Sequence, residues 1–102
     1  MTREAALEAL DQCRQQIDEL DLRMLHLLNQ RSGIVEQIGH IKQSAQMPIY
    51  EPKREDQVFE NVTTHNAGPL SPGAVKRVFE RIIDEMRKVQ RDRMEADKKQ
   101  CS

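Results

Sequence analysis

The sequence contains few of the residues that sheets, disulfide frameworks and membrane spans require. Its 102 residues include no tryptophan, one tyrosine and two phenylalanines, whereas strands favour aromatic and β-branched residues. Cys13 and Cys101 lie far apart without CxxC spacing, which excludes a disulfide framework and favours a reducing, cytoplasmic setting. Residues 1–20 lack the apolar segment of a signal peptide, and no apolar run is long enough to span a membrane. We therefore expect a soluble, cytoplasmic, helical protein.

The sequence also lacks an excess of charge of either sign. It has 16 Lys and Arg against 17 Asp and Glu, for a formal net charge of −1. Nucleic-acid binders carry a clear basic excess, so we expect no nucleic-acid partner. The basic residues of 87–99 alternate with acidic ones, which is typical of a solvated helix face. The length allows a single domain, 1–102, that is marginal as a monomer, so association with a second copy is plausible.

The first 43 residues contain no proline and carry a sustained apolar stripe. It steps by three and four through Leu10, Cys13, Ile17, Leu20, Met24, Leu27, Arg31, Ile34, Ile38 and Ile41. This spacing predicts one long helix that packs as in a coiled coil. We expect the polar run 43–47 and Pro48 to end it.

The length of this helix predicts a dimer. About 38 residues span roughly 57 Å at 1.5 Å per residue, whereas a compact 100-residue domain has a radius of gyration of about 13 Å. The distal part of the stripe then needs a partner, and a second copy of the chain is the simplest one. The alternative is a helix that is bent or broken near Gly33 or Gly39.

Two further helices follow. Pro52 suits the first position of a short helix that ends near the loop 66–69, and Ser71–Pro72 is an N-cap followed by an N1 proline. The third helix has an apolar inner face of Val75, Val78, Phe79, Ile82, Ile83, Met86 and Val89. After Val89 the sequence becomes charged, and we expect residues 91–102 to fray. The predicted fold is therefore all-α, with one very long, one short and one medium helix in an intertwined helical homodimer.

Several polar side chains fall where apolar ones are expected. Arg31 interrupts the stripe, and Lys42 points the same way about 16 Å along the axis, eleven residues later. Arg54 and Glu55 begin the second helix, and Gln90 borders the apolar face of the third. Each alone has a structural explanation, such as a coiled-coil register device for Arg31 or an exposed rim position for Lys42. Together they predict a cationic pocket for a small anion with several carboxylates.

Arg14 does not reach that pocket from its own chain. It lies about 25 Å from Arg31 along the helix and is rotated by about 100°. In an antiparallel or crossed dimer it could serve the pocket of the partner. The same dimer follows from the length of the first helix.

These polar residues and others along the chain together resemble the pattern of a known family. The residues that carry the resemblance are Arg14, Ile17-Asp18, Leu20-Asp21, Leu27-Leu28-Asn29, Arg31, Ile38-Gly39, Lys42, Pro48-Ile49-Tyr50, Pro52, Arg54-Glu55, Asn66, Gly68-Pro69-Leu70, Phe79, Ile82-Ile83 and Gln90. In this order and spacing, across about residues 7–90, they resemble the all-helical AroQ class of chorismate mutases. The resemblance implies a helical homodimeric isomerase that converts chorismate to prephenate in aromatic amino-acid biosynthesis, with no metal or other cofactor.

The resemblance also implies a role for each candidate residue. Arg14 matches an arginine supplied by the partner chain, and Arg31 and Arg54 match cations that hold the substrate carboxylates. Lys42 and Gln90 match the donors to the ether oxygen, and Glu55 matches the acceptor for the ring hydroxyl. Two substrate-binding positions depart from the family pattern: Glu51 stands where many relatives have aspartate, and Met86 where some have serine. The loss of that serine removes one carboxylate hydrogen bond.

Other interpretations remain open at this stage. An isochorismate pyruvate-lyase shares the fold and a similar pocket, and a regulatory or docking module could act on another shikimate-pathway enzyme. A purely structural coiled coil would explain the stripe but not Arg31, Lys42 and Gln90 together. His26, His40 and His65 are scattered without metal-ligand spacing. Sequence does not separate a stand-alone enzyme from a piece of a bifunctional one, and it does not reveal feedback control.

Overall fold

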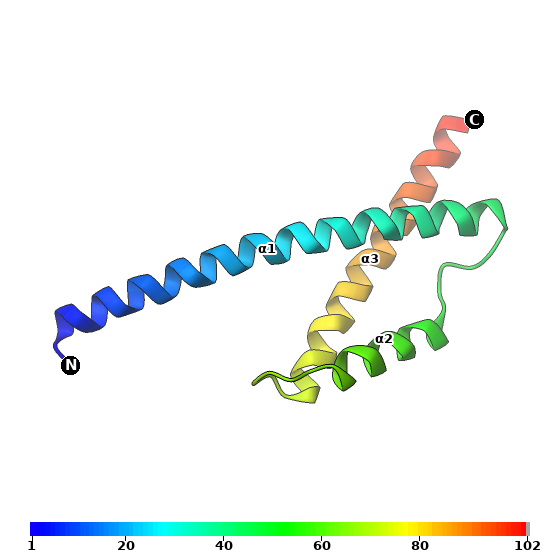
Figure 1. The fold of residues 1–102 in the computed structure, drawn as a ribbon. Coiled ribbons are helices and arrows are strands. Elements are labelled where there is room, and N and C mark those ends of the chain that lie inside the picture. Colours follow the sequence, from blue (N-terminus) through cyan, green and yellow to red (C-terminus); the bar gives the residue numbers. More distant parts are fainter. Residues whose placement is uncertain (102) are drawn as a thin grey trace. The chain divides into compact units, whose positions relative to one another are not determined.

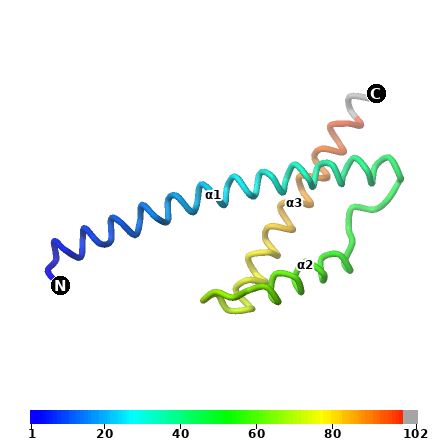
Figure 2. The backbone as a smooth tube through the Cα atoms, viewed as in Figure 1, coloured from blue at the N-terminus to red at the C-terminus, as the bar shows by residue number. Residues whose placement is uncertain are grey.

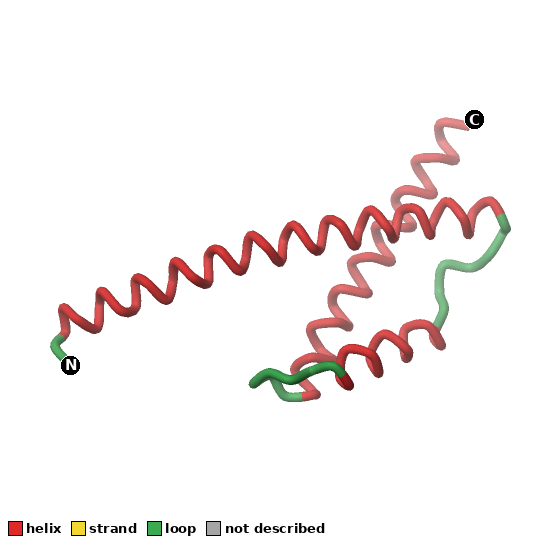
Figure 3. Tube along the Cα trace, viewed as in Figure 1, coloured by secondary structure: helices red, strands yellow, loops and turns green. Residues whose placement is uncertain are grey.

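A computed structural model describes residues 1–101, and the side chains of residues 1–98. Within this range the chain forms three α-helices and no strand (Figures 1 and 3): α1, Arg3–Ser44; α2, Pro52–Thr64; and α3, Pro72–Cys101. The predicted all-α fold and order of helices are confirmed. The chain divides after Gly33 into an N-terminal unit and a C-terminal unit.

The N-terminal unit consists of the first part of α1. Thr2 caps the helix, since its Oγ1 accepts a hydrogen bond from the Ala5 amide at 3.1 Å. α1 passes through Gly33 and Gly39, so a break at either glycine is excluded. The apolar stripe is exposed in the single chain at Leu10, Ile17, Leu20, Met24 and Leu27. These side chains gain nothing from the hydrophobic effect until another apolar surface covers them.

The C-terminus of α1 is closed by a hydrogen-bonded turn before Pro48 is reached. The Met47 amide donates to the Lys42 carbonyl at 2.8 Å and the Gln46 amide donates to the Gln43 carbonyl at 3.3 Å. These two bonds form a Schellman motif, with Gln46 in the left-handed region at φ 57°. Glycine is the usual residue there, because a Cβ is strained in this conformation. Local turn geometry therefore ends the helix, rather than the proline alone.

Replacing Gln46 by glycine should stabilise the fold. Relief of the left-handed strain, partly offset by the greater entropy of the unfolded chain, should raise the free energy of unfolding by about 1 kcal/mol. Thermal denaturation should show a melting temperature higher by roughly 4 °C or more. The matched control is Gln37→Gly on the exposed helical part of α1, which should destabilise by about 1 kcal/mol. A Gln46→Gly variant no more stable than the wild type would contradict the strain assigned to this turn.

The starts of α2 and α3 follow the sequence signals. Pro52 occupies the first turn of α2 after Glu51, whose side chain makes no capping hydrogen bond. Ser71 caps α3, because its Oγ accepts from the Ala74 amide at 3.1 Å. The linker 45–51, which joins α1 to α2, can be followed in Figure 2.

The core of the C-terminal unit is small and lies where α2 packs on α3 beside the end of α1. Its buried apolar side chains are Val35, Val75, Ile83 and Met86. Phe59 and Phe79 are half-buried. Val78 was predicted on the inner face of α3, but it is 53% exposed. It lies about 80° from the centre of that face at 100° per residue, which puts it on the flank of the helix.

α3 extends well beyond its apolar face. We expected residues 91–102 to fray, whereas the structure keeps the chain helical to Cys101. The ion pairs of Asp97 with His40, at 3.1 Å, and with Arg93, at 3.7 Å, accompany this extension. Charged side chains spaced by four residues support a solvated helix without an apolar stripe. The side chain of Cys101 and all of Ser102 lie outside the described residues, and none of the described helices could span a membrane.

Candidate functional site

Lys42, near the end of α1, is a buried cation of the C-terminal unit. Lys42 is only 7% exposed. Its Nζ donates to the Ile49 carbonyl at 2.9 Å and forms an ion pair with Glu51 Oε1 at 2.7 Å. A buried ammonium needs such partners, because desolvation without them costs several kcal/mol. Both partners come from the linker 45–51 region, so the linker folds back over the Lys42 side chain.

Gln90 is a buried amide on α3 that contacts the same face of α1. It is 7% exposed, and its Nε2 donates to the Val35 carbonyl at 3.3 Å. A Cβ added at Gly39 would lie 3.6 Å from Gln90 Cγ, which shows how closely the two helices approach there. Lys42 follows Gly39 by three residues on that face of α1. The structure thus brings the two predicted ether-oxygen donors to neighbouring turns of one helix face.

Glu55 lies on the first turns of α2 and is tied to α3 by an arginine. Arg87 Nη2 donates to Glu55 Oε1 at 2.6 Å and to Asp84 Oδ1 at 3.1 Å. The guanidinium carbon of Arg87 lies 5.5 Å from the centroid of the Tyr50 ring, within cation–π distance. Glu55 therefore pairs with Arg87, a different cation from Lys42.

Sequence reasoning missed Arg87 as a candidate. It was grouped with the alternating charges of 87–99 and interpreted as part of a solvated face. In the structure its side chain is only 27% exposed. Its position, four residues after Ile83 and three before Gln90, was the available signal, because this spacing places it at the edge of the apolar face of α3.

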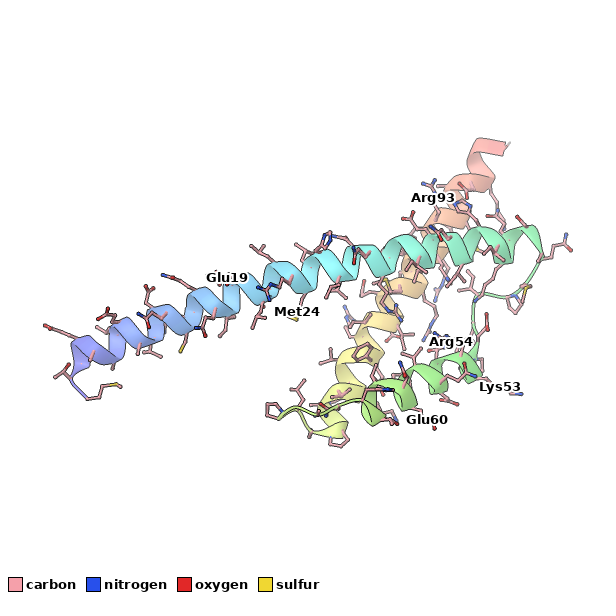
Figure 4. All side chains as sticks on the ribbon, in the orientation of Figure 1. Glu19, Met24, Lys53, Arg54, Glu60 and Arg93 are labelled. Carbon is pink, nitrogen blue, oxygen red and sulfur yellow. The ribbon has the colours of Figure 1, made fainter. Side chains whose placement is uncertain are left out.

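The remaining candidates of the C-terminal unit differ in burial. Met86 is buried, so the position where some relatives have serine contributes apolar surface. Glu51 is exposed apart from its contact with Lys42. Arg54 is exposed, and its Nη1 donates a long hydrogen bond of 3.4 Å to Gln57 Oε1. Figure 4 shows Arg54 next to Lys53 at the beginning of α2. An exposed guanidinium here can meet an anion without first breaking a strong ion pair.

Arg14 and Arg31 belong to the N-terminal unit. Arg14 is exposed, whereas Arg31 is half-buried. Their place relative to Lys42, Glu55 and Gln90 stays a prediction from the sequence. The candidates on α2, α3 and the end of α1 lie in the C-terminal unit, and their common role as one site stays a prediction.

The chain is similar to known proteins in both sequence and structure. The family model for chorismate mutase type II matches residues 13–91. A bifunctional chorismate mutase/prephenate dehydratase of Aquifex aeolicus is 35% identical over 81 residues, which are 76% of this chain and 22% of that protein. A chorismate mutase of Methanocaldococcus jannaschii is 25% identical over 93 residues, with 87% of this chain and 91% of that protein covered.

A solved structure extends the similarity to three dimensions. The chain is similar to the chorismate mutase of Helicobacter pylori, crystallised in complex with prephenate, with a TM-score of 0.81 and 28% identity. The match covers 86% of this chain and 96% of that one. The chain spans only about a fifth of the length of the bifunctional relatives that it matches.

Proposed function

Because the chain belongs to the chorismate mutase type II family, we propose that it is an isomerase that rearranges chorismate to prephenate. The observation that carries the proposal is the pair of buried nitrogen donors, Lys42 and Gln90, on facing helices of one unit. A pericyclic rearrangement needs no nucleophile and no acid–base pair. It needs a pocket that holds a flexible dianion and stabilises the charge that develops as the bonds change.

The first task of the site is to select the reactive conformer of the substrate. The substrate carries two carboxylates, and guanidinium groups bind carboxylates through two parallel hydrogen bonds. We assign this role to Arg31 and Arg54, together with Arg14 of the second chain. Holding the two reacting ends together replaces a rare encounter in solution with a bound, compact geometry. Glu55, as the acceptor for the ring hydroxyl, buried Met86 and the linker residue Glu51 complete the proposed substrate-binding set.

The second task is to stabilise the ether oxygen. The C–O bond breaks ahead of C–C bond formation, so negative charge builds on that oxygen in the transition state. An ammonium has three N–H donors, and two hydrogen-bond acceptors engage Lys42. A primary amide has two N–H donors, and Gln90 donates one of them to the Val35 carbonyl. Counting the contacts of the described residues, each side chain keeps a donor for the substrate while its protein contacts hold it in place, which favours the transition state over the ground state.

The proposed active form is a homodimer in which two chains share each site. The exposed stripe of the N-terminal unit supports this proposal, because a second copy carries the matching apolar surface. Arg14 would then reach the site of the partner chain. A two-fold axis would generate two equivalent sites.

We also propose that the chain acts in the cytoplasm and in association with another enzyme of the same pathway. The bifunctional relatives support the association, since each joins a matching segment to a further activity within one longer chain. Joining two catalytic domains raises their effective concentration for each other. Co-purification from the source cells, or covalent fusion in the complete gene product, would reveal such a partner.

Loss of chorismate absorbance provides the direct test of the proposed activity. The purified chain should convert chorismate to prephenate in buffer that contains a chelator, at a rate equal to that without the chelator. An enzymatic barrier reduction of about 8 kcal/mol lies at the lower end of the usual range, so turnover should be readily measured. Inactivity toward chorismate, or an absolute requirement for a metal ion, would contradict the proposal. Release of pyruvate from isochorismate would instead indicate the lyase.

A further inference from the structure

Arg87 is held in place by contacts with three segments of the C-terminal unit. One guanidinium nitrogen, Nη2, bonds to Glu55 of α2 at 2.6 Å and to Asp84 of its own helix at 3.1 Å. The guanidinium also lies over the ring of Tyr50 in the linker, at 5.5 Å. Cation–π contact and two carboxylates fix both the position and the plane of this group. Arg87 therefore presents a constrained positive charge to Glu55.

This placement does not optimise the hydrogen bonds of Arg87 itself. Within the described residues its Nε is buried and has no hydrogen-bond partner. A buried donor without a partner is costly, and native proteins rarely retain one. The guanidinium instead directs its terminal nitrogen to Glu55, at a distance typical of a strong charge-assisted hydrogen bond. The contact with Glu55 thus dominates over the pairing of Nε.

We propose that Arg87 is a positioning residue that sets substrate specificity through Glu55, an inference that rests on the proposed function. In that function Glu55 accepts the hydrogen bond of the substrate ring hydroxyl. Arg87 occupies Oε1 of Glu55, and in this proposal the other oxygen, Oε2, accepts from the substrate. A carboxylate oxygen has the lone pairs to accept a hydroxyl donor without any change of charge.

The ion pair also determines which donor Glu55 prefers. Arg87, which also pairs with Asp84, offsets part of the negative charge of the Glu55 carboxylate. A neutral hydroxyl therefore suits this carboxylate better than it would without Arg87. In a substrate analogue with an amine in place of the hydroxyl, the amino group is protonated near pH 7, and Arg87 repels the positive charge of that group. Without Arg87, the bare carboxylate would attract that amine much more strongly than a hydroxyl. Arg87 thus selects the hydroxyl compound.

The test compares kcat/KM for chorismate and for 4-amino-4-deoxychorismate in the wild type and in Arg87→Met. The ratio of amine to hydroxyl substrate should rise by roughly ten-fold or more in the variant, because one unit charge close to the amine is removed. In the double variant Arg87→Met/Glu55→Gln the rise should disappear, since no carboxylate remains. The matched control is Arg81→Met, which removes an arginine–carboxylate pair of α3 with Glu85 at 2.9 Å that does not include Glu55. It should leave the ratio unchanged.

The outcomes separate this inference from the proposed function. If the wild type turns over neither substrate, the proposed function fails and this inference falls with it. If the wild type is active but folded Arg87→Met loses both activities equally, Arg87 is only structural and this inference alone is wrong. Should Arg87→Met not fold, Arg87→Gln and Arg87→Lys replace it. The ratio should rise in the glutamine variant and stay near the wild-type value in the lysine variant, and equal ratios in the two would overturn the proposal.

Discussion

Replacing Lys42 by alanine is expected to reduce the turnover of chorismate by about 10²–10³-fold, the usual effect of removing one donor to a developing oxyanion. Lys42 is a buried cation of the C-terminal unit, and its remaining donor is the one proposed to meet the ether oxygen. Gln90→Ala should have an effect of the same order. Both losses should appear mainly in kcat, because the charge on the oxygen develops in the transition state.

The folding of these two variants should change far less than their activity. Removal of Lys42 leaves Glu51 with a side chain that is 44% exposed, so water can replace the lost partner. Removal of the Gln90 amide takes one donor from the Val35 carbonyl. That carbonyl belongs to the backbone of helix α1, so the cost to folding should be small. Thermal denaturation of each variant checks this point. The matched control is Lys88→Ala, which removes an exposed cation paired with Glu85 at 3.4 Å and should keep full activity. Near-normal turnover in folded Lys42→Ala would contradict its catalytic role.

A mixture of two nearly inactive variants should recover about a quarter of the wild-type activity. Arg14→Ala and Lys42→Ala, unfolded and refolded together in equal amounts, pair at random, so about half of the dimers are mixed. In a mixed dimer one site combines the intact Arg14 of one chain with the intact Lys42 of the other. The second site carries both changes. One active site in two, in half of the dimers, yields one quarter.

The matched control for this experiment is a mixture of Lys42→Ala and Gln90→Ala. Both residues lie in the same unit of one chain, so no mixed dimer of this pair contains an intact site, and no activity should return. Native mass spectrometry verifies that mixed dimers have formed. If the mixture of Arg14→Ala and Lys42→Ala contains mixed dimers and stays inactive, the sharing of sites between chains is wrong. Arg14 would then act within its own chain or only in folding.

The sequence predicted the helices because their signals are local. Capping by Ser71, the proline at Pro52 and the apolar spacing of α1 and α3 all act within a few residues. The turn at Gln46 escaped prediction for a related reason. Its left-handed backbone carries no glycine, so the usual mark of a helix C-terminus is absent. The helical extension beyond Val89 was missed because pairs such as Arg93 and Asp97 sustain a helix without an apolar stripe.

The candidate site likewise has features that local sequence patterns predict and features that depend on helix packing. Sequence alone was enough to select Lys42, Glu55 and Gln90, because a polar residue on or beside an apolar face requires an explanation. It could not pair Arg87 with Glu55, which lie 32 residues apart on two helices. It also could not seat Lys42 against Ile49 and Glu51. Such contacts depend on how helices pack, which local patterns do not encode. The sequence by itself selected Lys42 and Gln90 as polar residues on or beside apolar faces, and only the tertiary structure decided which partners hold them and that Arg87 pairs with Glu55.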